Sequence, residues 1–349
     1  MAIKNNYQRI VFLFLIMVIS GGFLIPGDKV SASEPILVKF NYAGPQSPPS
    51  MHPLSQAIGL FGKKLEENSQ GRFKVEIFWN ASLYKDNAEQ YEALKAGTIQ
   101  MCEVSGGRLG NEIPATYLME LPFIFDNMNH VYSFLLGSGK KLFEPLYLEK
   151  GYKLMGFWPY GFQNFVSRKG FLAKPDDFAD VKLRIRPSKI VEAQMQALGA
   201  KAKAIPYMET YNALKDKVVD GAECPLSVIH AVTWHETGDY ITISEHSLLF
   251  AAMLVNPEFY NGLPTESENN LKKIFDDTFK EVTDFELKTQ EELEKKMEGI
   301  MQAERPALKF KRLADAERNV LKKRCKSVWK QYGKMIPKEF FDAVVNEAL

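Results

Sequence analysis

The chain has 349 residues, with 44 basic and 43 acidic side chains and a formal net charge of +1 at pH 7. This near-neutral balance excludes the strongly basic surface that nucleic-acid-binding proteins need, so we expect no nucleic-acid partner. The cysteines, Cys102, Cys224 and Cys325, are too few and too widely spaced for a disulfide scaffold or a cysteine-based metal site.

The first 32 residues have the pattern of a cleavable secretory signal peptide. Lys4 and Arg9 precede an apolar run over residues 10–25, and Val30-Ser31-Ala32 fits the small-x-small cleavage pattern. An uncleaved membrane anchor is the alternative, but paired glycines interrupt the run, and no later stretch is apolar enough to span a bilayer. We therefore expect export to the periplasm and a mature chain that begins at Ser33.

Strands and helices alternate in the first part of the mature chain. The pattern predicts strands over 36–43, 73–80 and 99–105, and helices over 52–68 and 87–97. Such alternation favours parallel pairing and an α/β sheet.

A second region repeats this arrangement. Strands are predicted over 152–158, 162–168, 181–186 and 201–206, and helices over 188–198 and 208–219. Residues 240–257 have the composition of one long strand, long enough to cross from one lobe to another.

The C-terminal part of the chain is predicted to be helical. From Thr265, apolar residues recur every three or four positions, and Glu268 completes a capping-box spacing. A helix of about 35 residues would be roughly 50 Å long and would brace two lobes. Further helices are predicted over 308–333 and 337–348. The mature chain exceeds what one compact core usually holds, so the sequence predicts two α/β lobes.

The sequence contains no recognisable catalytic motif. G-x-S-x-G, H-E-x-x-H, G-x-x-x-x-G-K-[ST] and C-x-x-C are all missing, and His230 and His235 are spaced off a common helical face. We therefore predict no catalytic residue, no metal ligand and no cofactor.

The stretch VKLRIRPSKI, residues 181–190, alternates aliphatic and cationic side chains. On a strand, Lys182, Arg184 and Arg186 would share one face. That face is either the solvated side of an edge strand or a site for an anion. The strand ends just before a helix, which is where ligands bind in open α/β sheets, and an arginine there can hold a carboxylate through two parallel hydrogen bonds.

Four stretches together resemble the solute-binding subunits of tripartite ATP-independent periplasmic (TRAP) transporters, of the DctP type. They are GRFKVEIFWNASLYKDNAEQYEALKAGTIQM (71–101), ATYLMELPFIFDN (115–127), VKLRIRPS (181–188) and METYNALKDKVVDGAECP (208–225). Their order and spacing span nearly the whole mature chain. The resemblance implies a periplasmic binding protein fold, with hinged lobes, crossing strands and a long bracing helix.

The same resemblance implies particular ligand-binding residues. The arginine that bonds the substrate carboxylate corresponds to Arg184, and an aromatic residue of the pocket corresponds to Tyr207. Arg186 shares the strand face of Arg184, so it is either a second anchor or a structural arginine. Tyr207 could instead pack at the start of a helix.

The chain departs from the family pattern at two places. Cys224 replaces a side-chain amide, and Gln163 or Asn164 stands where many members have a second arginine. A neutral amide cannot pair with a charge as an arginine does, so we expect one carboxylate on the substrate, with hydroxyl, keto or apolar groups elsewhere. Trp158 and Phe162 either line an apolar part of the pocket or pack in the core.

The first lobe offers further candidates. Asn41 and Tyr42 end the first strand, and Ser105 and Gly106 follow the third strand, where small residues let backbone N–H groups approach a ligand. The alternative for this turn is a plain connection. Glu223 is a candidate acceptor for a ligand hydroxyl, or a partner for a nearby cation.

We place lobe I at 33–157 plus 250–305 and lobe II at 158–249 plus 306–349. The expected function is a monomeric, non-enzymatic periplasmic receptor that binds a small organic acid and delivers it to a TRAP permease for ion-gradient-driven uptake. The alternatives are a secreted enzyme acting on a small carboxylate, and a binding protein that feeds an ATP-driven importer or a sensor kinase.

Overall fold

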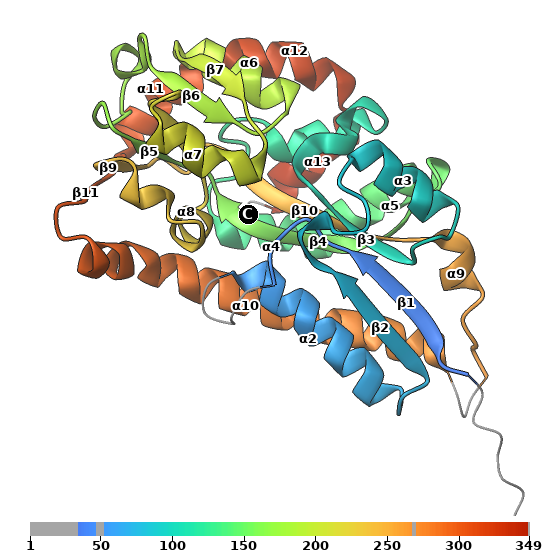
Figure 1. Ribbon diagram of the computed structural model, residues 1–349. Coiled ribbons are helices and arrows are strands. Elements are labelled where there is room, and N and C mark those ends of the chain that lie inside the picture. Colours follow the sequence, from blue (N-terminus) through green and yellow to red (C-terminus); the bar gives the residue numbers. More distant parts are fainter. Residues whose placement is uncertain (1–33, 47–51, 267–269, 348–349) are drawn as a thin grey trace, which may run out of the picture. The chain divides into compact units, whose positions relative to one another are not determined.

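The strands form two β-sheets, which Figure 1 shows with helices packed on them. The computed structural model describes residues 34–46, 52–266 and 270–347. Both sheets belong to one compact unit, Ile36–Leu349. The predicted signal peptide, residues 1–32, lies outside the described residues. In the part of the chain that is described, no helix combines the length and apolar character needed to traverse a bilayer.

The first sheet has five strands in the order β2-β1-β3-β10-β4. They are β1 (Ile36–Asn41), β2 (Phe73–Phe78), β3 (Met101–Ser105), β4 (Lys153–Phe162) and β10 (Leu248–Val255). β1 pairs in parallel with β2 and β3, whereas β10 runs antiparallel to β3 and β4. β10 is buried along its whole length, which explains its continuous apolar sequence.

The second sheet has six strands in the order β11-β9-β5-β8-β6-β7. They are β5 (Asn164–Ser167), β6 (Lys182–Ile185), β7 (Lys201–Ala204), β8 (Gly221–Cys224), β9 (Tyr240–Ile243) and β11 (Lys309–Arg312). β6 pairs in parallel with β7 on one side and β8 on the other. The strand that carries Arg184 is therefore an interior strand and not an edge strand.

The helices near the first sheet are α2 (Pro53–Asn68), α3 (Asn87–Lys95), α4 (Met128–Phe134), α5 (Lys140–Glu149) and α9 (Pro257–Asn261). Apart from α5, each begins after a residue whose side chain caps it. The Asp86 side chain accepts hydrogen bonds from the backbone N–H groups of Ala88 and Glu89 at the start of α3. Two 3-10 helices, η2 (Gly106–Asn111) and η3 (Pro114–Glu120), follow β3. The sequence analysis assigned no element between 106 and 149.

The remaining helices pack mainly on the second sheet. They are α6 (Lys189–Leu198), α7 (Thr210–Lys215), α8 (Leu226–Ala231), α11 (Asp315–Arg324) and α12 (Lys326–Tyr332). The helix predicted over 308–333 is wrong in two respects: its first residues form β11, and it is divided at Cys325. The last helix, α13 (Lys338–Glu347), returns to contact α4.

A long helix, α10 (Leu271–Glu304), contacts α2 and also α8 (Figure 1). The predicted bracing helix therefore exists, with 34 residues. It begins later than predicted, because the Asn270 side chain caps it by accepting from the Lys273 N–H. Glu268 of the predicted capping box lies outside the described residues.

Two of the connections between the sheets, from β4 to β5 and from β9 to β10, lie next to each other. Gln163 alone separates β4 from β5, and residues 244–247 separate β9 from β10. The Gln163 N–H donates to the Ser247 carbonyl (2.8 Å), and the His246 N–H donates to the Gln163 carbonyl (3.3 Å). The single strand predicted over 240–257 is thus two strands in different sheets, and their connection lies beside the other crossing.

Candidate ligand-binding site

A cavity of about 930 Å³ lies between the two sheets, within the size range typical of small-molecule sites. Its first-sheet wall includes Tyr42, Glu103, Ser105, Arg108 and Tyr160. Its opposite wall includes Arg184, Arg186, Tyr207, Glu223 and Cys224, and Gln163 reaches it from the crossing. β1, β3, β6 and β8 all end at this cavity, as expected for a ligand site in α/β sheets.

Arg184 presents a buried cation to the cavity. Its side chain is 3% exposed, its Nε donates to the Ile205 carbonyl (3.0 Å), and its guanidinium lies 5.2 Å from the centre of the Trp234 ring. No described residue forms a hydrogen bond or ion pair with its terminal nitrogens. Burial lowers the pKa of Arg184, yet a guanidinium stays charged in proteins, so this part of the cavity wall carries a positive charge that is complementary to an anion.

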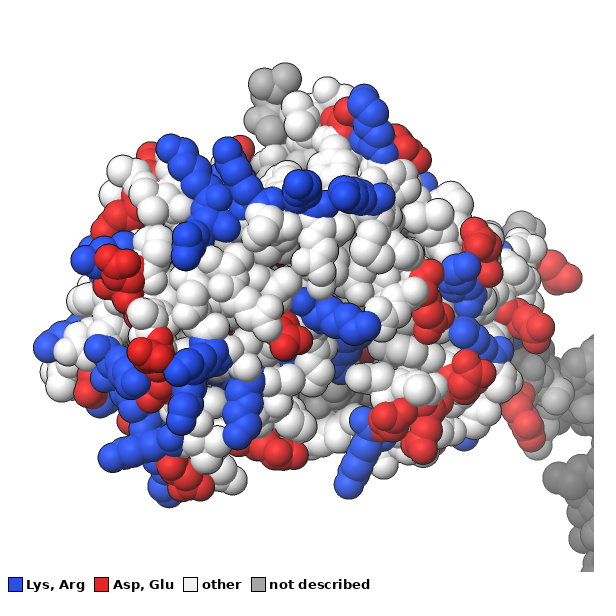
Figure 2. All heavy atoms as spheres, turned by 90° about the horizontal axis from the view of Figure 1, so that it is seen from above, with Lys and Arg blue, Asp and Glu red and all other residues white. Residues whose placement is uncertain are grey.

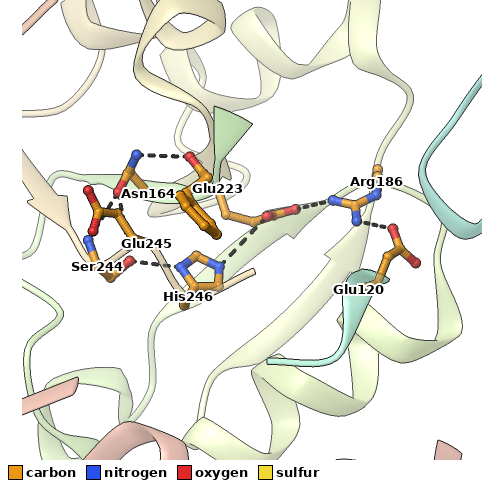
Figure 3. A network of polar contacts seen from close by, with 8 residues as sticks. Glu120, Asn164, Arg186, Glu223, Ser244, Glu245 and His246 are labelled. Carbon is orange, nitrogen blue, oxygen red and sulfur yellow. Dashed lines mark hydrogen bonds and ion pairs between the residues drawn. The ribbon is translucent and has the colours of Figure 1, made fainter. Parts of the chain in front are cut away.

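Arg186 is held differently, because two carboxylates engage it (Figure 3). It forms ion pairs with Glu120 and with Glu223, the latter at 3.3 Å. Burial opposes the charge of Arg186, but these two carboxylates outweigh burial and raise its pKa. The arrangement favours a structural role over direct ligand binding.

The network continues from Glu223 towards the crossing between β9 and β10 (Figure 3). Glu223 Oε2 lies 3.8 Å from His246 Nε2, and His246 Nδ1 lies 2.7 Å from Ser244 Oγ. The His246 ring stacks on Phe165, with centroids 4.3 Å apart. Burial raises the pKa of Glu223 to about 7, against the effect of Arg186, and burial lowers the pKa of His246 to about 3. His246 is therefore neutral at physiological pH.

The first-sheet wall carries hydroxyl groups and one buried carboxyl group. The Tyr42 hydroxyl lies 3.2 Å from Ser55 Oγ, and the Tyr160 hydroxyl donates to Glu103 Oε1 (3.4 Å). Burial raises the pKa of Glu103 to about 7, with Arg108 acting in the opposite direction. Burial also raises the pKa values of Tyr42 and Tyr160, so both phenols stay protonated.

Eight of the thirteen residues that the sequence analysis proposed line this cavity: Tyr42, Ser105, Gln163, Arg184, Arg186, Tyr207, Glu223 and Cys224. The other five lie elsewhere, and among them Phe162 packs in the core. Asn41 is buried and donates to the Tyr84 carbonyl (3.1 Å) and to Gln90 Oε1 (2.5 Å). Asn164 accepts at Oδ1 from the backbone N–H groups of Ser244 (3.0 Å) and Glu245 (3.1 Å). Its amide therefore holds the crossing in place.

Trp158 and Gly106 also have structural positions and do not line the cavity. Trp158 belongs to the core, where it stacks on Phe279 and donates to Thr283 Oγ1 (2.8 Å). Gly106 is placed against the ion pair behind the cavity: a Cβ there would lie 2.7 Å from Glu120 Oε1. Its φ of +62° also favours glycine.

The sequence analysis did not identify Glu103, Tyr160, Glu120, Trp234 or His246 as parts of this region. Glu103 had a detectable signal, because it is the one charged residue in the otherwise apolar strand IQMCEVS. Glu120 and His246 had none, since their roles depend on contacts with residues far away in sequence. Among the described residues, no group of three or more His, Cys, Asp or Glu side chains could hold a metal ion.

Comparison with known proteins places this geometry in a family. Residues 45–335 match the family described as bacterial extracellular solute-binding protein, family 7 (DctP). The C4-dicarboxylate-binding periplasmic protein DctP of Rhodobacter capsulatus is 33% identical over 69% of this chain and 71% of its own length. The C4-dicarboxylate-binding protein DctB of Bacillus subtilis is 30% identical over 89% of this chain and 86% of its own length.

Solved structures agree with the fold. A TRAP periplasmic solute-binding protein from Sulfurospirillum deleyianum, with bound succinate, superposes with a TM-score of 0.77 at 28% identity, covering 88% of this chain and 98% of its own. One from Pseudomonas aeruginosa, with bound L-malate, gives 0.76 at 26% identity, covering 85% and 100%. The predicted two-lobed α/β fold is confirmed, and the chain belongs to the DctP family of bacterial extracellular solute-binding proteins, the substrate-binding proteins of TRAP transporters.

Proposed function

We propose that this chain is a periplasmic receptor that binds a small organic acid in the cavity between its sheets and delivers it to a TRAP permease. The observation that carries this proposal is the buried Arg184 in the cavity wall, whose terminal nitrogens form no hydrogen bond or ion pair with a described residue. A carboxylate can satisfy both terminal nitrogens at once, which a single-point anion cannot. The succinate and L-malate bound to two similar structures support a carboxylate ligand.

Binding is coupled to closure of two lobes about the crossings. We propose that the hinge lies at Gln163 and residues 244–247, which moves the lobe boundaries expected at 157/158 and 249/250 to these crossings. Lobe I is then 33–162 plus 248–305, so that it holds all of β4 and β10, and lobe II is 164–243 plus 306–337. The cavity takes residues from both sheets, so a ligand that contacts both walls favours the closed form over the open one. α13 contacts α4, which supports assigning this last helix to lobe I instead of lobe II.

We further propose that the receptor is not an enzyme. Glu120 and Glu223 are engaged with Arg186, and burial raises the pKa of the Cys224 thiol beside Arg184, so this thiol is not activated as a nucleophile. A secreted enzyme remains the alternative function, and incubation with candidate acids followed by product analysis separates the two. Basic and acidic side chains are interspersed on the face shown in Figure 2, which supports the proposal of no nucleic-acid partner.

The experiment that tests the receptor proposal compares Arg184→Ala with Lys182→Ala. Lys182 lies on the same strand but is exposed, so its variant controls for a general loss of positive charge. A thermal-shift screen of mono- and dicarboxylates, sugar acids and keto acids first identifies the binding acid. Calorimetry should then show at least a hundredfold weaker binding for Arg184→Ala, about 2.7 kcal/mol, and unchanged binding for Lys182→Ala. Equal affinity of Arg184→Ala and the unaltered protein would refute the proposal.

A further inference from the structure

The wall opposite Arg184 contains a carboxyl group without a basic partner. Glu103 lies in β3, lines the cavity and is only 3% exposed. Within the described ranges, no Lys, Arg or His forms an ion pair with it. Arg108 is close enough to oppose the rise in the pKa of Glu103, but its Nη1 donates instead to Asn87 Oδ1 (3.0 Å).

The polar groups between this carboxyl group and Arg184 are also incompletely satisfied. Gln163 Oε1 is buried and accepts no hydrogen bond from any described residue, and the buried Tyr207 hydroxyl likewise has no partner there. Tyr207 belongs to the cavity wall that contains Arg184, where its ring lies 5.9 Å from the Trp234 ring.

These groups define what a ligand must supply. At one end, the terminal nitrogens of Arg184 lack an acceptor. At the other end, Gln163 Oε1 lacks a donor, and the Glu103 carboxyl group receives one long hydrogen bond, from the Tyr160 hydroxyl (3.4 Å), and has no basic partner among the described residues. Buried polar groups are almost always paired in native complexes, so a bound ligand should complete both sets. A second carboxylate would be repelled by Glu103 whenever Glu103 is ionised. A hydroxyl or ammonium group of the ligand would instead donate a hydrogen bond to Glu103, and an ammonium would also favour the ionised form of Glu103.

Resting on the receptor function proposed above, we propose that the ligand carries a hydroxyl or ammonium group at the end remote from its carboxylate, and that this group donates a hydrogen bond to Glu103. The site then has two anchors, Arg184 for the carboxylate and Glu103 for the donor. It selects hydroxy or amino acids over dicarboxylates of the same length.

One feature of the cavity argues for a different ligand. Lys85 and Arg108 also line it on the first-sheet side, and Lys85 forms no ion pair with a described residue. These cations could hold a second carboxylate. Lys85 is exposed and Arg108 is partly exposed, so each is better solvated than Glu103 and has less need of a counter-ion.

The test uses four matched series of acids with three to six carbons: unsubstituted, ω-hydroxy, ω-amino and α,ω-dicarboxylic. Calorimetry on the unaltered protein should show at least one ω-hydroxy or ω-amino acid binding about tenfold or more tightly than the dicarboxylate of equal length. Preference for the amino series would identify an ammonium, and preference for the hydroxy series a hydroxyl. This comparison does not depend on the folding of any variant.

Variants then assign the preference to one residue. Glu103→Gln keeps the shape but removes the charge, so it should abolish the preference over the dicarboxylate. Glu76→Gln, an exposed carboxylate on β2, is the matched control and should change nothing. Tight, Arg184-dependent binding of dicarboxylates that Glu103→Gln leaves unchanged or strengthens would overturn the inference and leave the receptor function intact. If no acid of any series binds, both proposals fail.

Discussion

Arg186 and Glu120 form an ion pair that is almost wholly enclosed and joins the end of β6 to the end of η3. The Glu120 side chain is fully buried, and that of Arg186 is 7% exposed. Gly106 and Gly107 lie against Glu120 so closely that a Cβ at either position would meet its carboxylate oxygens. The pair therefore connects the second sheet to the segment that follows β3, behind the cavity.

Replacing Arg186 by Met should destabilise the protein, because it leaves Glu120 and Glu223 buried without their cation. Removal of one partner from a buried pair typically costs about 3–5 kcal/mol. Urea denaturation of the ligand-free protein measures this loss. The double variant Arg186→Met/Glu120→Gln should be less destabilised than Arg186→Met alone. If Arg186→Met instead leaves stability unchanged and weakens ligand binding as strongly as Arg184→Ala, Arg186 is a ligand anchor.

His246 should make the protein less stable in acid. Its pKa is lowered to about 3 in the folded protein, against about 6.5 when unfolded, so the unfolded chain takes up the proton first. This contribution to stability is present above pH 6.5 and is lost as the pH falls towards 3. The groups that face the ring are Phe165, Arg186, Glu223, Ser244 and Arg318.

The variant His246→Gln isolates this effect. The free energy of unfolding is measured by urea titration at several pH values between 7 and 4. It should fall less steeply with decreasing pH in the variant, and the difference in slope should correspond to at most one bound proton. His230→Gln, which changes a histidine paired with Glu304 at the molecular surface, is the control. Identical slopes for the unaltered protein and His246→Gln would contradict the prediction.

Glu286, in contrast to His246, should make the protein less stable as the pH rises. It is fully buried on α10, neither carboxyl oxygen has a hydrogen-bond partner among the described residues, and burial raises its pKa well above 4.5. Its contribution to stability is present below the unfolded pKa of about 4.5 and is lost as the pH rises through the folded value. Glu286→Gln should therefore raise the melting temperature at pH 8 and have little effect at pH 4.5. The exposed Glu298→Gln on the same helix is the control, and an equal shift at both pH values would count against the charge-based explanation.

The three thiols should resist alkylation in the native protein. Cys102, Cys224 and Cys325 are all free and buried, and burial raises the pKa of each, to about 12 for Cys325. Mass spectrometry after treatment with iodoacetamide should find no modification in buffer and three modifications in denaturant. Rapid native labelling of Cys224 alone would show that the cavity opens enough to expose its wall.

Sequence patterns predicted most of the regular elements, because helices such as α2 and α10 bury one apolar face and strands such as β3 are short, largely apolar runs. They failed where the chain changes sheets within one predicted strand. Residues 240–257 have strand composition on both sides of the polar residues 244–247, and there the chain passes from β9 to β10 with backbone hydrogen bonds to Asn164 and Gln163. Local propensity carries no information about such distant partners.

Sequence reasoning was similarly uneven for the site. Arg184, Tyr207 and Cys224 were found through motif spacing, and all line the cavity. The distinction between Arg184 and Arg186 was not available from the strand pattern, since both lie on one face. It arises from Glu120 and Glu223, which reach Arg186 from other elements and leave Arg184 without an acidic partner among the described residues.

The single-residue connection between β4 and β5 has a consequence for kinetics. Gln163 lines the cavity and also exchanges backbone hydrogen bonds with the neighbouring crossing. A solute that contacts the Gln163 side chain therefore contacts a residue of the proposed hinge. Relaxation-dispersion NMR of the Gln163 amide would report the opening rate directly, and substitutions at this position should alter how long a solute stays bound before release.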